Sequence, residues 1–402
     1  MEISAYEEIC EVIDGIKICS VGDGICINAL FLCAFTFVKL REKFMRFIRY
    51  GKIMAWVLSL MLYFMASAQA QTVSFRLIKV IPLPTVDRGG DVVSYDPSNH
   101  KVYVSMGNTD AGGVIINADN DTLVKVVRNG IVRPGGIAWN NKYVYWTSDV
   151  HLKENKDGKD ATVKRFGRVV VVDKNNWKTV DTFTTLGTGA DGIWADQGLG
   201  RLYVALDNSN WIEEYTLGKQ PKVVGKINLF PATGDGPDLG VLVSAQHLLY
   251  MPDDSWEEKI NLLNGQIEAK ANIAPYFSAS STGHHPNTKG QIYDPQSQTV
   301  WVGTNRSQLF VFDAKSMKVL AHLPAHAGID QVAYDPTYHL VYAFESDAKG
   351  FNVYNAQTMK PVTFVSTGYG KAHTGAVDPS NHKIFVYVGE AHAVYVYQPV
   401  HG

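Results

Sequence analysis

Seven aromatic residues in short apolar runs each follow a polar or charged residue by twelve positions. The aromatic residues are Tyr103, Tyr145, Tyr203, Tyr250, Trp301, Tyr342 and Phe385. The residues twelve positions earlier are Asp91, Arg133, Asp191, Asp238, Lys289, Asp330 and His373. Carboxylates and an imidazole in one place could hold a hard divalent cation or transfer a proton. The shared register predicts that these seven residues, here called the polar ring, converge in space as a binding site.

The polar ring also has a purely structural interpretation. Its aspartates could cap their own loops and pair with Arg133 and Lys289 around trapped water. Networks of this kind shift pKa values without doing chemistry. The sequence leaves both interpretations open, and they differ in whether any carboxylate is left without a cation partner.

A second group of residues extends the metal hypothesis. His284 and His285 lie in a long loop, Ser278–Lys289, and with His373 they form a trio that would suit Zn²⁺. The compact acidic turn Gly234–Asp238 lies at the ring and could bind Ca²⁺ through carboxylate oxygens. The candidate metal site predicted from these features consists of His284, His285, His373, Asp235 and Asp238. Its cofactor would be a divalent metal, namely Ca²⁺, Mg²⁺ or Zn²⁺.

The elements that must position these residues are short strands. After residue 71, alternating or apolar runs are separated by Gly, Asp, Asn and Pro, and helical periodicity is nearly absent. In the first copy the expected strands are Gly90–Asp96, Lys101–Met106, Gly113–Asp119 and Thr122–Arg128. Such a four-stranded unit cannot bury both faces alone, so copies must stack around an axis. The sequence therefore predicts an all-β fold, a seven-bladed β-propeller of four-stranded antiparallel blades.

The two ends of the repeat region complement each other. The seventh copy provides Thr374–Asp378, Lys383–Val388 and Ala393–Tyr397 but no outer strand. An orphan strand, Ser74–Pro84, precedes the first copy. Pairing the two would close the ring and remove two exposed sheet edges. We therefore expect the N-terminal strand to join the C-terminal blade.

The region before the repeats has the layout of a targeting segment. Basic residues between 46 and 52 precede an apolar stretch and the small-residue site Ala68–Ala70, which is typical of a signal peptide. We interpret residues 1–44 as an extension from a start codon placed too early, residues 45–70 as the signal peptide, and residues 71–402 as the propeller. The alternative is a first membrane segment at Ile25–Val38, a run that is short for a span. The signal-peptide interpretation predicts a periplasmic or secreted protein.

Several turns resemble those of a known family. Asp-Pro turns precede Lys101–Val104 (KVYV) and Lys383–Val386 (KIFV), and Trp301-Val302 is followed by Thr304-Asn305. These features resemble the YVTN-repeat propellers, which include exported YncE-like proteins, although no copy contains the complete tetrapeptide. The resemblance implies seven blades and export from a bacterial cell. It implies no molecular activity.

Composition narrows the possible functions. The net charge is −2 without clustered basic residues, which argues against a nucleic-acid partner. After the leader no apolar run is long enough to span a membrane. The leading hypothesis is a monomeric binding scaffold whose loop face, at the channel mouth, takes a protein, glycan or small-molecule ligand. The alternatives are a divalent-metal-dependent hydrolase or lyase resembling propeller lactonases, and an accessory subunit of a redox enzyme.

One long loop stands out on the expected ligand side. His151–Phe166 interleaves four lysines with three acidic residues. This composition predicts a mobile, solvated flap that could cover the channel.

Overall fold

The computed structural model describes residues 9–13, 16–21, 24–25, 73–107, 111–156, 158–230, 236–277 and 285–401. The chain divides into two compact units, Met1–Gln71 and Thr72–Gly402. In the first unit β1 (Ile9–Ile13), β2 (Ile16–Val21) and β3 (Gly24–Ile25) form an antiparallel sheet. The expected signal peptide at residues 45–70 lies outside the described residues. Within the described ranges, no helix has the length and apolar character to cross a membrane.

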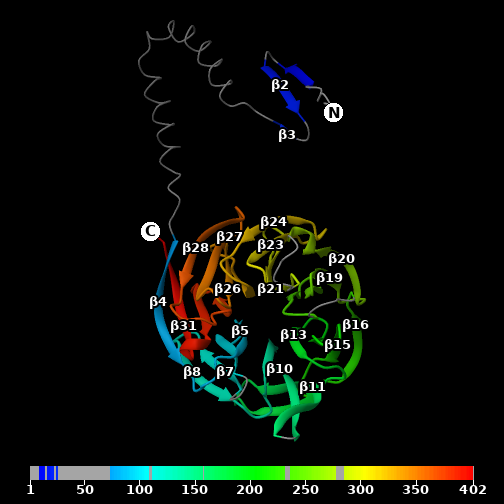
Figure 1. Ribbon diagram of the computed structural model, residues 1–402, viewed down its shortest axis with the longest axis vertical. Coiled ribbons are helices and arrows are strands. Elements are labelled where there is room, and N and C mark those ends of the chain that lie inside the picture. Colours follow the sequence, from blue (N-terminus) through cyan, green and yellow to red (C-terminus); the bar gives the residue numbers. More distant parts are fainter. Residues whose placement is uncertain are drawn as a thin grey trace. The chain divides into compact units, whose positions relative to one another are not determined.

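The second unit consists of seven four-stranded antiparallel sheets arranged in a ring (Figure 1). Blade 1 contains β5 (Gly90–Asp96), β6 (Lys101–Met106), β7 (Gly112–Asn117) and β8 (Thr122–Val127). Blade 2 contains β9 (Pro134–Trp139), β10 (Tyr143–Lys156), β11 (Lys159–Asp173) and β12 (Thr179–Thr184). Blade 3 contains β13 (Ala190–Asp196), β14 (Arg201–Leu206), β15 (Trp211–Thr216) and β16 (Val223–Asn228). The first strand of each blade is the innermost.

The remaining blades follow the same plan. Blade 4 contains β17 (Val241–Val243), β18 (Leu248–Asp253), β19 (Trp256–Asn261) and β20 (Gln266–Asn272), followed by the 3₁₀ turn η1 (Ala274–Tyr276). Blade 5 contains β21 (Thr288–Asp294), β22 (Thr299–Thr304), β23 (Gln308–Asp313) and β24 (Val319–Pro324). Blade 6 contains β25 (Ile329–Asp335), β26 (Leu340–Glu345), β27 (Gly350–Asn355) and β28 (Lys360–Ser366). The predicted seven-bladed, all-β fold is confirmed.

Blade 7 closes the ring with strands from both ends of the unit. It contains β29 (Thr374–Asp378), β30 (Lys383–Val388), β31 (Ala393–His401) and, outermost, β4 (Val73–Pro82), with the 3₁₀ turn η2 (Gly389–Ala391) between β30 and β31. The β4–β31 ladder is antiparallel and extends from Pro82 opposite Ala393 to Val73 opposite His401. The expected closure by the N-terminal strand is therefore confirmed.

Apolar side chains hold the blades together at their shared faces. One buried cluster joins Val93 and Val104 of blade 1 to Phe385 and Val394 of blade 7, with Ile81 near the end of β4. Successive side chains of a strand point to opposite faces, so each blade contributes to the clusters on both of its sides. The core is thus a series of interfaces between blades, and it fixes where the start of each innermost strand lies.

At the face away from the polar ring, each of five innermost strands ends in a buried aspartate. These turn aspartates are Asp96, Asp196, Asp294, Asp335 and Asp378, and each is at most 1% exposed. Each accepts a backbone N–H within its own turn; in Asp335, for example, Oδ1 accepts from Thr337 at 2.9 Å. This is the Asx-turn geometry for which aspartate is favoured.

The turn aspartates also bind the next blade along the chain. His382 Nδ1 lies 2.7 Å from Asp335 Oδ2, and His247 Nδ1 lies 2.7 Å from Asp196 Oδ2. Donors from the following blade reach the other three aspartates as well: Lys174 for Asp96, Tyr334 for Asp294 and Tyr95 for Asp378. One residue type therefore shapes a turn and links two blades at the same time.

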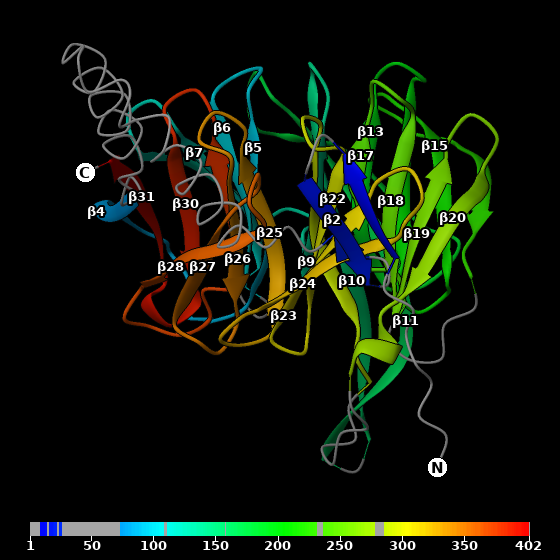
Figure 2. The ribbon, with the colours of Figure 1, turned by 90° about the horizontal axis from the view of Figure 1, so that it is seen from above.

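The segment expected to be a solvated flap is instead a β-hairpin. Strands β10 and β11 stay paired from Tyr143 opposite Asp173 out to Lys156 opposite Lys159. Figure 2 shows this arm projecting beyond the other blades. At its base Arg165 donates to both oxygens of Asp149, with Nη2 at 2.7 Å from Oδ2, and to Asn208 at 2.9 Å. Cross-strand hydrogen bonding organised a segment whose composition indicated only a polar loop.

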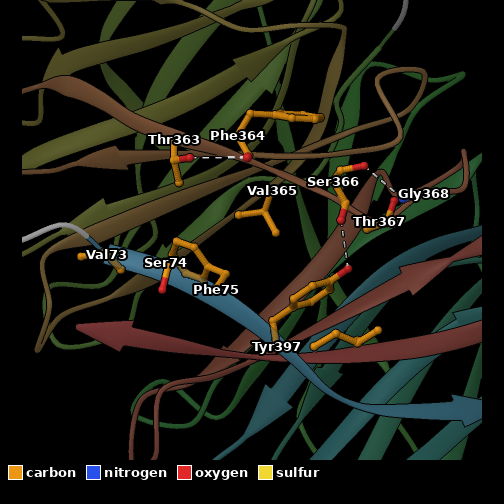
Figure 3. Close-up of a pocket in the computed structure, with 11 residues that line it drawn as sticks. Val73, Ser74, Phe75, Thr363, Phe364, Val365, Ser366, Thr367, Gly368 and Tyr397 are labelled. Carbon is orange, nitrogen blue, oxygen red and sulfur yellow. Dashed lines mark hydrogen bonds between the residues drawn. The ribbon is translucent and has the colours of Figure 1, made fainter. Parts of the chain in front are cut away.

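A groove of about 610 Å³ lies on the outer rim, away from the innermost strands (Figure 3). It runs between β4 and the end of β28, and Phe75, Val365 and Tyr397 are among its lining side chains. The groove therefore lies between the outer strands of blades 6 and 7, beside the strand that closes the ring.

Candidate functional site at the channel mouth

Strand pairing places six members of the polar ring at equivalent positions. In each of these six blades, the aromatic residue that lies twelve positions after the ring residue is on the second strand. It pairs with the residue nine positions before it, on the innermost strand, as Tyr103 pairs with Ser94. The polar residue lies three positions before that partner. The six residues are Asp91, Asp191, Asp238, Lys289, Asp330 and His373. They also interact electrostatically with one another, so the structure brings them together at one mouth of the ring.

Arg133 does not occupy the equivalent position in blade 2. Tyr145 pairs there with Ala138, only seven residues earlier, because the turn between β9 and β10 is two residues shorter. Gly135 is therefore the residue that matches Asp91, while Arg133 is exposed and precedes β9. The expectation that every copy aligns without a gap is wrong for blade 2. The missing Asp-Pro turn of that copy is the sequence signal that could have revealed the difference.

Two of the four ring carboxylates are paired with a ring cation from the next blade. Lys289 Nζ donates to Asp238 Oδ2 at 2.6 Å, and His373 Nδ1 lies 2.6 Å from Asp330 Oδ2. All four side chains are largely buried, between 15% and 32% exposed. These two contacts are the ion pairs that the structural interpretation of the ring requires.

The contact between His373 and Asp330 favours the charged form of both groups. Burial tends to lower the pKa of His373, but the hydrogen bond and charge of Asp330, with the charge of Asp91, outweigh it and raise the pKa. Burial likewise tends to raise the pKa of Asp330, yet His373, Lys289 and Lys371 together lower it. The other imidazole nitrogen, Nε2, is enclosed and has no hydrogen-bond partner. An imidazolium here thus has one N–H bound to Asp330 and one without an acceptor.

The other two carboxyl groups face each other. The side chains of Asp91 and Asp191 are in hydrogen-bond contact, although they belong to blades 1 and 3. Gly135 of blade 2 makes this contact possible, since a Cβ there would lie 2.6 Å from Asp191 Oδ1. Two carboxyl groups in hydrogen-bond contact must share a proton, because two adjacent carboxylates repel each other.

The pKa values agree with a shared proton. Burial, and then the charges of Asp330 and Asp238, raise the pKa of Asp91 to about 7. Burial and the charge of Asp91 also raise the pKa of Asp191 well above its usual range. The pair therefore holds a proton more readily than isolated aspartates do, and the two groups titrate as a unit.

Side chains one position further along the innermost strands contact other blades. Gln331 of blade 6 donates through Nε2 to the carbonyl of Val93 in blade 1 at 2.8 Å, and its Oε1 accepts from the Val93 N–H at 3.2 Å. Leu239 of blade 4 packs against the apolar cluster that contains Val92 of blade 1. The residues that follow the ring residues therefore join blades that are not neighbours in the ring. We call the six ring residues, together with Val92, Leu239 and Gln331, the mouth cup.

The described members of the candidate metal site do not form a coordination group. Asp238 and His373 face Lys289 and Asp330, and the exposed His285 is 3.5 Å from Asp254. Asp235 and His284 lie outside the described residues. In the described part of the chain, no group of three or more His, Cys, Asp or Glu residues is placed to hold a metal ion. The described members of the candidate metal site therefore stay a prediction without a coordination group around them, and we derive no chemistry through a metal.

Three glutamates, of which Glu213 and Glu345 are buried, hold loops that lead into the innermost strands. Glu213 accepts the N–H of Gly187 at 2.9 Å, and Glu345 accepts that of Ala327 at 3.1 Å. Glu390 accepts the N–H of Gly370 at 2.8 Å. Sequence analysis missed these residues as well as Gly135 and Gln331. For Glu345 the signal was an acidic residue that directly follows the apolar run Leu340–Phe344.

These observations define the class of the protein: a seven-bladed β-propeller with a cluster of charged side chains at one mouth of its axis. No model of a known protein family matches the chain, and no curated protein matches it. The resemblance to YVTN-repeat propellers therefore rests on the repeat motifs alone.

Proposed function

We propose that this chain is an exported, YVTN-type propeller that acts as a binding scaffold, and that the mouth cup is its ligand site. Propellers commonly serve as binding scaffolds, and the layout of residues 45–70 supports export to the periplasm or beyond. The loop face around the cup would receive the ligand.

The observation that carries this proposal is the contact between Asp91 and Asp191. A ring that served only to join the blades would be expected to neutralise its charges in pairs, as Asp238–Lys289 and Asp330–His373 do. Burying two carboxyl groups against each other costs free energy that a pair of apolar residues would not cost. Groups kept in such an arrangement at a mouth are candidates for ligand contact.

The test is ligand binding by the full-length chain and by a matched variant. A panel of small molecules, glycans and peptides would be screened by the rise in melting temperature, and each hit would be measured with the double variant Asp91→Asn, Asp191→Asn. The proposal expects the variant to keep its fold and lose the hits. Hits bound equally well by the variant would place the binding site elsewhere.

Export has its own test. N-terminal sequencing of the protein recovered from its natural host should give a chain that begins directly after Ala70. A recovered protein that retains residues 45–70 would contradict cleavage at this position. No observation of the described residues favours the metal-dependent hydrolase or lyase, so a single function is proposed.

A further inference from the structure

The groove on the outer rim, here called the rim groove, lies between two strands at the edges of their sheets. Within the described residues, β4 pairs only with β31, and β28 pairs only with β27. Consecutive residues of both strands, 73–75 and 363–366, line the groove (Figure 3). Successive side chains of a strand point to opposite faces, so a groove lined by consecutive residues borders the backbone edges of the two strands.

The strand β4 offers the longest of these outer edges. It has ten residues, whereas the outer strands of the other six blades have six or seven. An edge strand presents a row of unpaired N–H and C=O groups that another chain can extend. Leu77 of β4 lines the groove and is 42% exposed, so this edge is open to a partner.

Three apolar side chains of the rim groove are anchored in the core. Phe75, Val365 and Tyr397 line the groove and pack in the hydrophobic cluster between blades 6 and 7. The ring of Phe75 lies edge-on to Tyr342 and Phe351, with centroids 6.0 and 6.1 Å away. Because these side chains are already ordered, an apolar side chain could bind here with little further loss of entropy.

The strands that line the rim groove carry basic side chains and no acidic ones. β4, β28 and β31 contain Arg76, Lys79 and Lys360 but no Asp or Glu. All three side chains are exposed, and no described residue forms an ion pair with them. Lys79 lies two residues after Leu77, and Lys360 lies three residues before Thr363, so these cations flank the lining segments. A bound segment that complements this charge is acidic.

The same charges disfavour pairing between two copies of β4. Two paired β4 strands would bring Arg76 and Lys79 of both copies to one interface. Like charges on adjacent strands destabilise a sheet, and cations on an edge strand protect it from self-association. An acidic strand would instead neutralise these cations.

We propose that the rim groove binds an extended acidic segment of another protein, which adds as a strand to the outer edge of β4. Hydrogen bonds to the backbone of β4 would supply affinity, and apolar side chains in the middle of the segment would pack on Phe75 and Leu77. Acidic side chains near the ends of the segment would pair with the flanking cations. This site is on the outer rim and is independent of the mouth cup.

Fluorescence anisotropy of labelled peptides with the full-length chain tests this proposal. The first probe, EDVTVFTVDE, has acidic ends and an alternating apolar middle. The second, KKVTVFTVKK, has lysine in place of the acidic residues, and the third, EDVPVFPVDE, keeps the charge but lacks two backbone N–H groups. We expect the first peptide to bind at low salt about tenfold more tightly than either of the others, since a few ion pairs or ladder hydrogen bonds together contribute about that much.

Hydrogen exchange measured by mass spectrometry locates the bound peptide. Backbone N–H groups of β4 should exchange more slowly when the first peptide is bound. Those of β8, the outer strand of blade 1, should be unchanged. Protection of another outer strand without protection of β4 would overturn the proposal.

Charge-reversing variants test the recognition of acidic side chains. Arg76→Glu combined with Lys79→Glu should weaken the first peptide at least tenfold and strengthen the second. Lys125→Glu, at an exposed position of β8, is the matched control and should change neither affinity. Because β4 closes the ring, the melting transition of each variant is measured first. If the double variant fails to fold, Lys360→Glu on β28 leaves β4 intact and should weaken the first peptide about threefold.

The remaining outcomes identify a different occupant. If the first peptide does not bind while vesicles of phosphatidylglycerol bind the wild-type chain and not the charge-reversed variant, the surface is a membrane contact and the proposal fails. If the wild-type chain forms a dimer that excludes the peptide, a second copy occupies the groove. Equal binding of the acidic and basic peptides, or no binding of either, also overturns the proposal. None of these results bears on the ligand of the mouth cup.

Discussion

Aspartates lie near both ends of several innermost strands, and the two sets behave differently. Asp335 ends β25 and Asp330 lies near its start, five residues apart; Asp91 and Asp96 are related in the same way on β5. Each turn aspartate has a hydrogen bond in its own turn and a donor from the next blade. In the mouth cup, only two of four aspartates have a cation, and the other two share a proton.

The difference follows from the number of donors that surround each carboxylate. A turn supplies backbone N–H groups at every aspartate, so the carboxylate is satisfied locally before the blades meet. Among the described ring aspartates, Asp238 accepts the N–H of Leu239 at 2.7 Å, whereas the contacts described for Asp91 and Asp330 are with other side chains. An aspartate in a turn therefore stabilises the fold, while an aspartate in the cup costs stability unless a partner or a ligand arrives.

The largest loss of stability should come from removing β4, the strand that closes the ring and on which both sets of aspartates depend. Deleting residues 72–84 removes β4, exposes the edge of β31 and takes the buried Ile81 and Leu83 out of the core. We expect loss of the cooperative thermal transition measured by circular dichroism, because an open ring exposes the apolar face of a blade. Deleting residues 1–44 is the control and should leave that transition in place. A truncated protein that still melts cooperatively near the wild-type temperature would contradict this account of closure.

The next largest loss of stability should come from replacing a turn aspartate. Asp335→Ala removes the acceptor of the Thr337 N–H and leaves His382 without its buried partner. We expect the free energy of unfolding to fall by about 3 kcal/mol, the cost of breaking a buried, hydrogen-bonded pair. Urea denaturation measures it. A loss within about 0.5 kcal/mol, as at an ordinary surface site, would remove the distinction between the two sets.

Replacing an aspartate of the mouth cup should instead increase the free energy of unfolding. The pKa of Asp91 is raised to about 7 in the folded protein, so between about pH 4 and pH 7 the folded state binds more protons than the unfolded state at this group. Its contribution to stability therefore falls as pH rises through that window. Asp91→Asn removes the contribution, and we expect the variant to gain on the order of 2 kcal/mol relative to wild type between pH 4.5 and pH 7.5. Urea denaturation at the two pH values checks it, and a difference that does not change with pH would contradict the shared proton.

The smallest change in stability should come from replacing Arg133. This side chain is exposed and lies outside the ring position that Gly135 occupies. Arg133→Ala should change the free energy of unfolding by less than about 0.5 kcal/mol, which is usual for surface substitutions. The melting temperature and the pH profile of stability should both match wild type. A marked change in the pH profile would return Arg133 to the ring.

Much of the fold could be predicted because its determinants are local and repeated. The apolar runs at Gly90–Asp96 and Lys101–Met106 predicted β5 and β6 with the observed bounds. The positions of the polar ring were predicted in six of the seven blades. They follow from the sequence because the length of the turn between the first two strands of a blade fixes how those strands pair. The prediction failed at Arg133 because blade 2 has a shorter turn, and the arm of β10 and β11 was missed because pairing between strands overrode polar composition.

By itself, the sequence determined the number of blades, the position of the turn aspartates and the closure of the ring, since hydrophobic periodicity and turn chemistry act over a few residues. Only the tertiary structure decided which ring residues pair. The contact of Asp91 with Asp191 requires a glycine in the blade between them, and Gln331 must reach from blade 6 to blade 1. Such contacts join residues far apart in the chain, and their energies depend on burial and on charges from every blade at once.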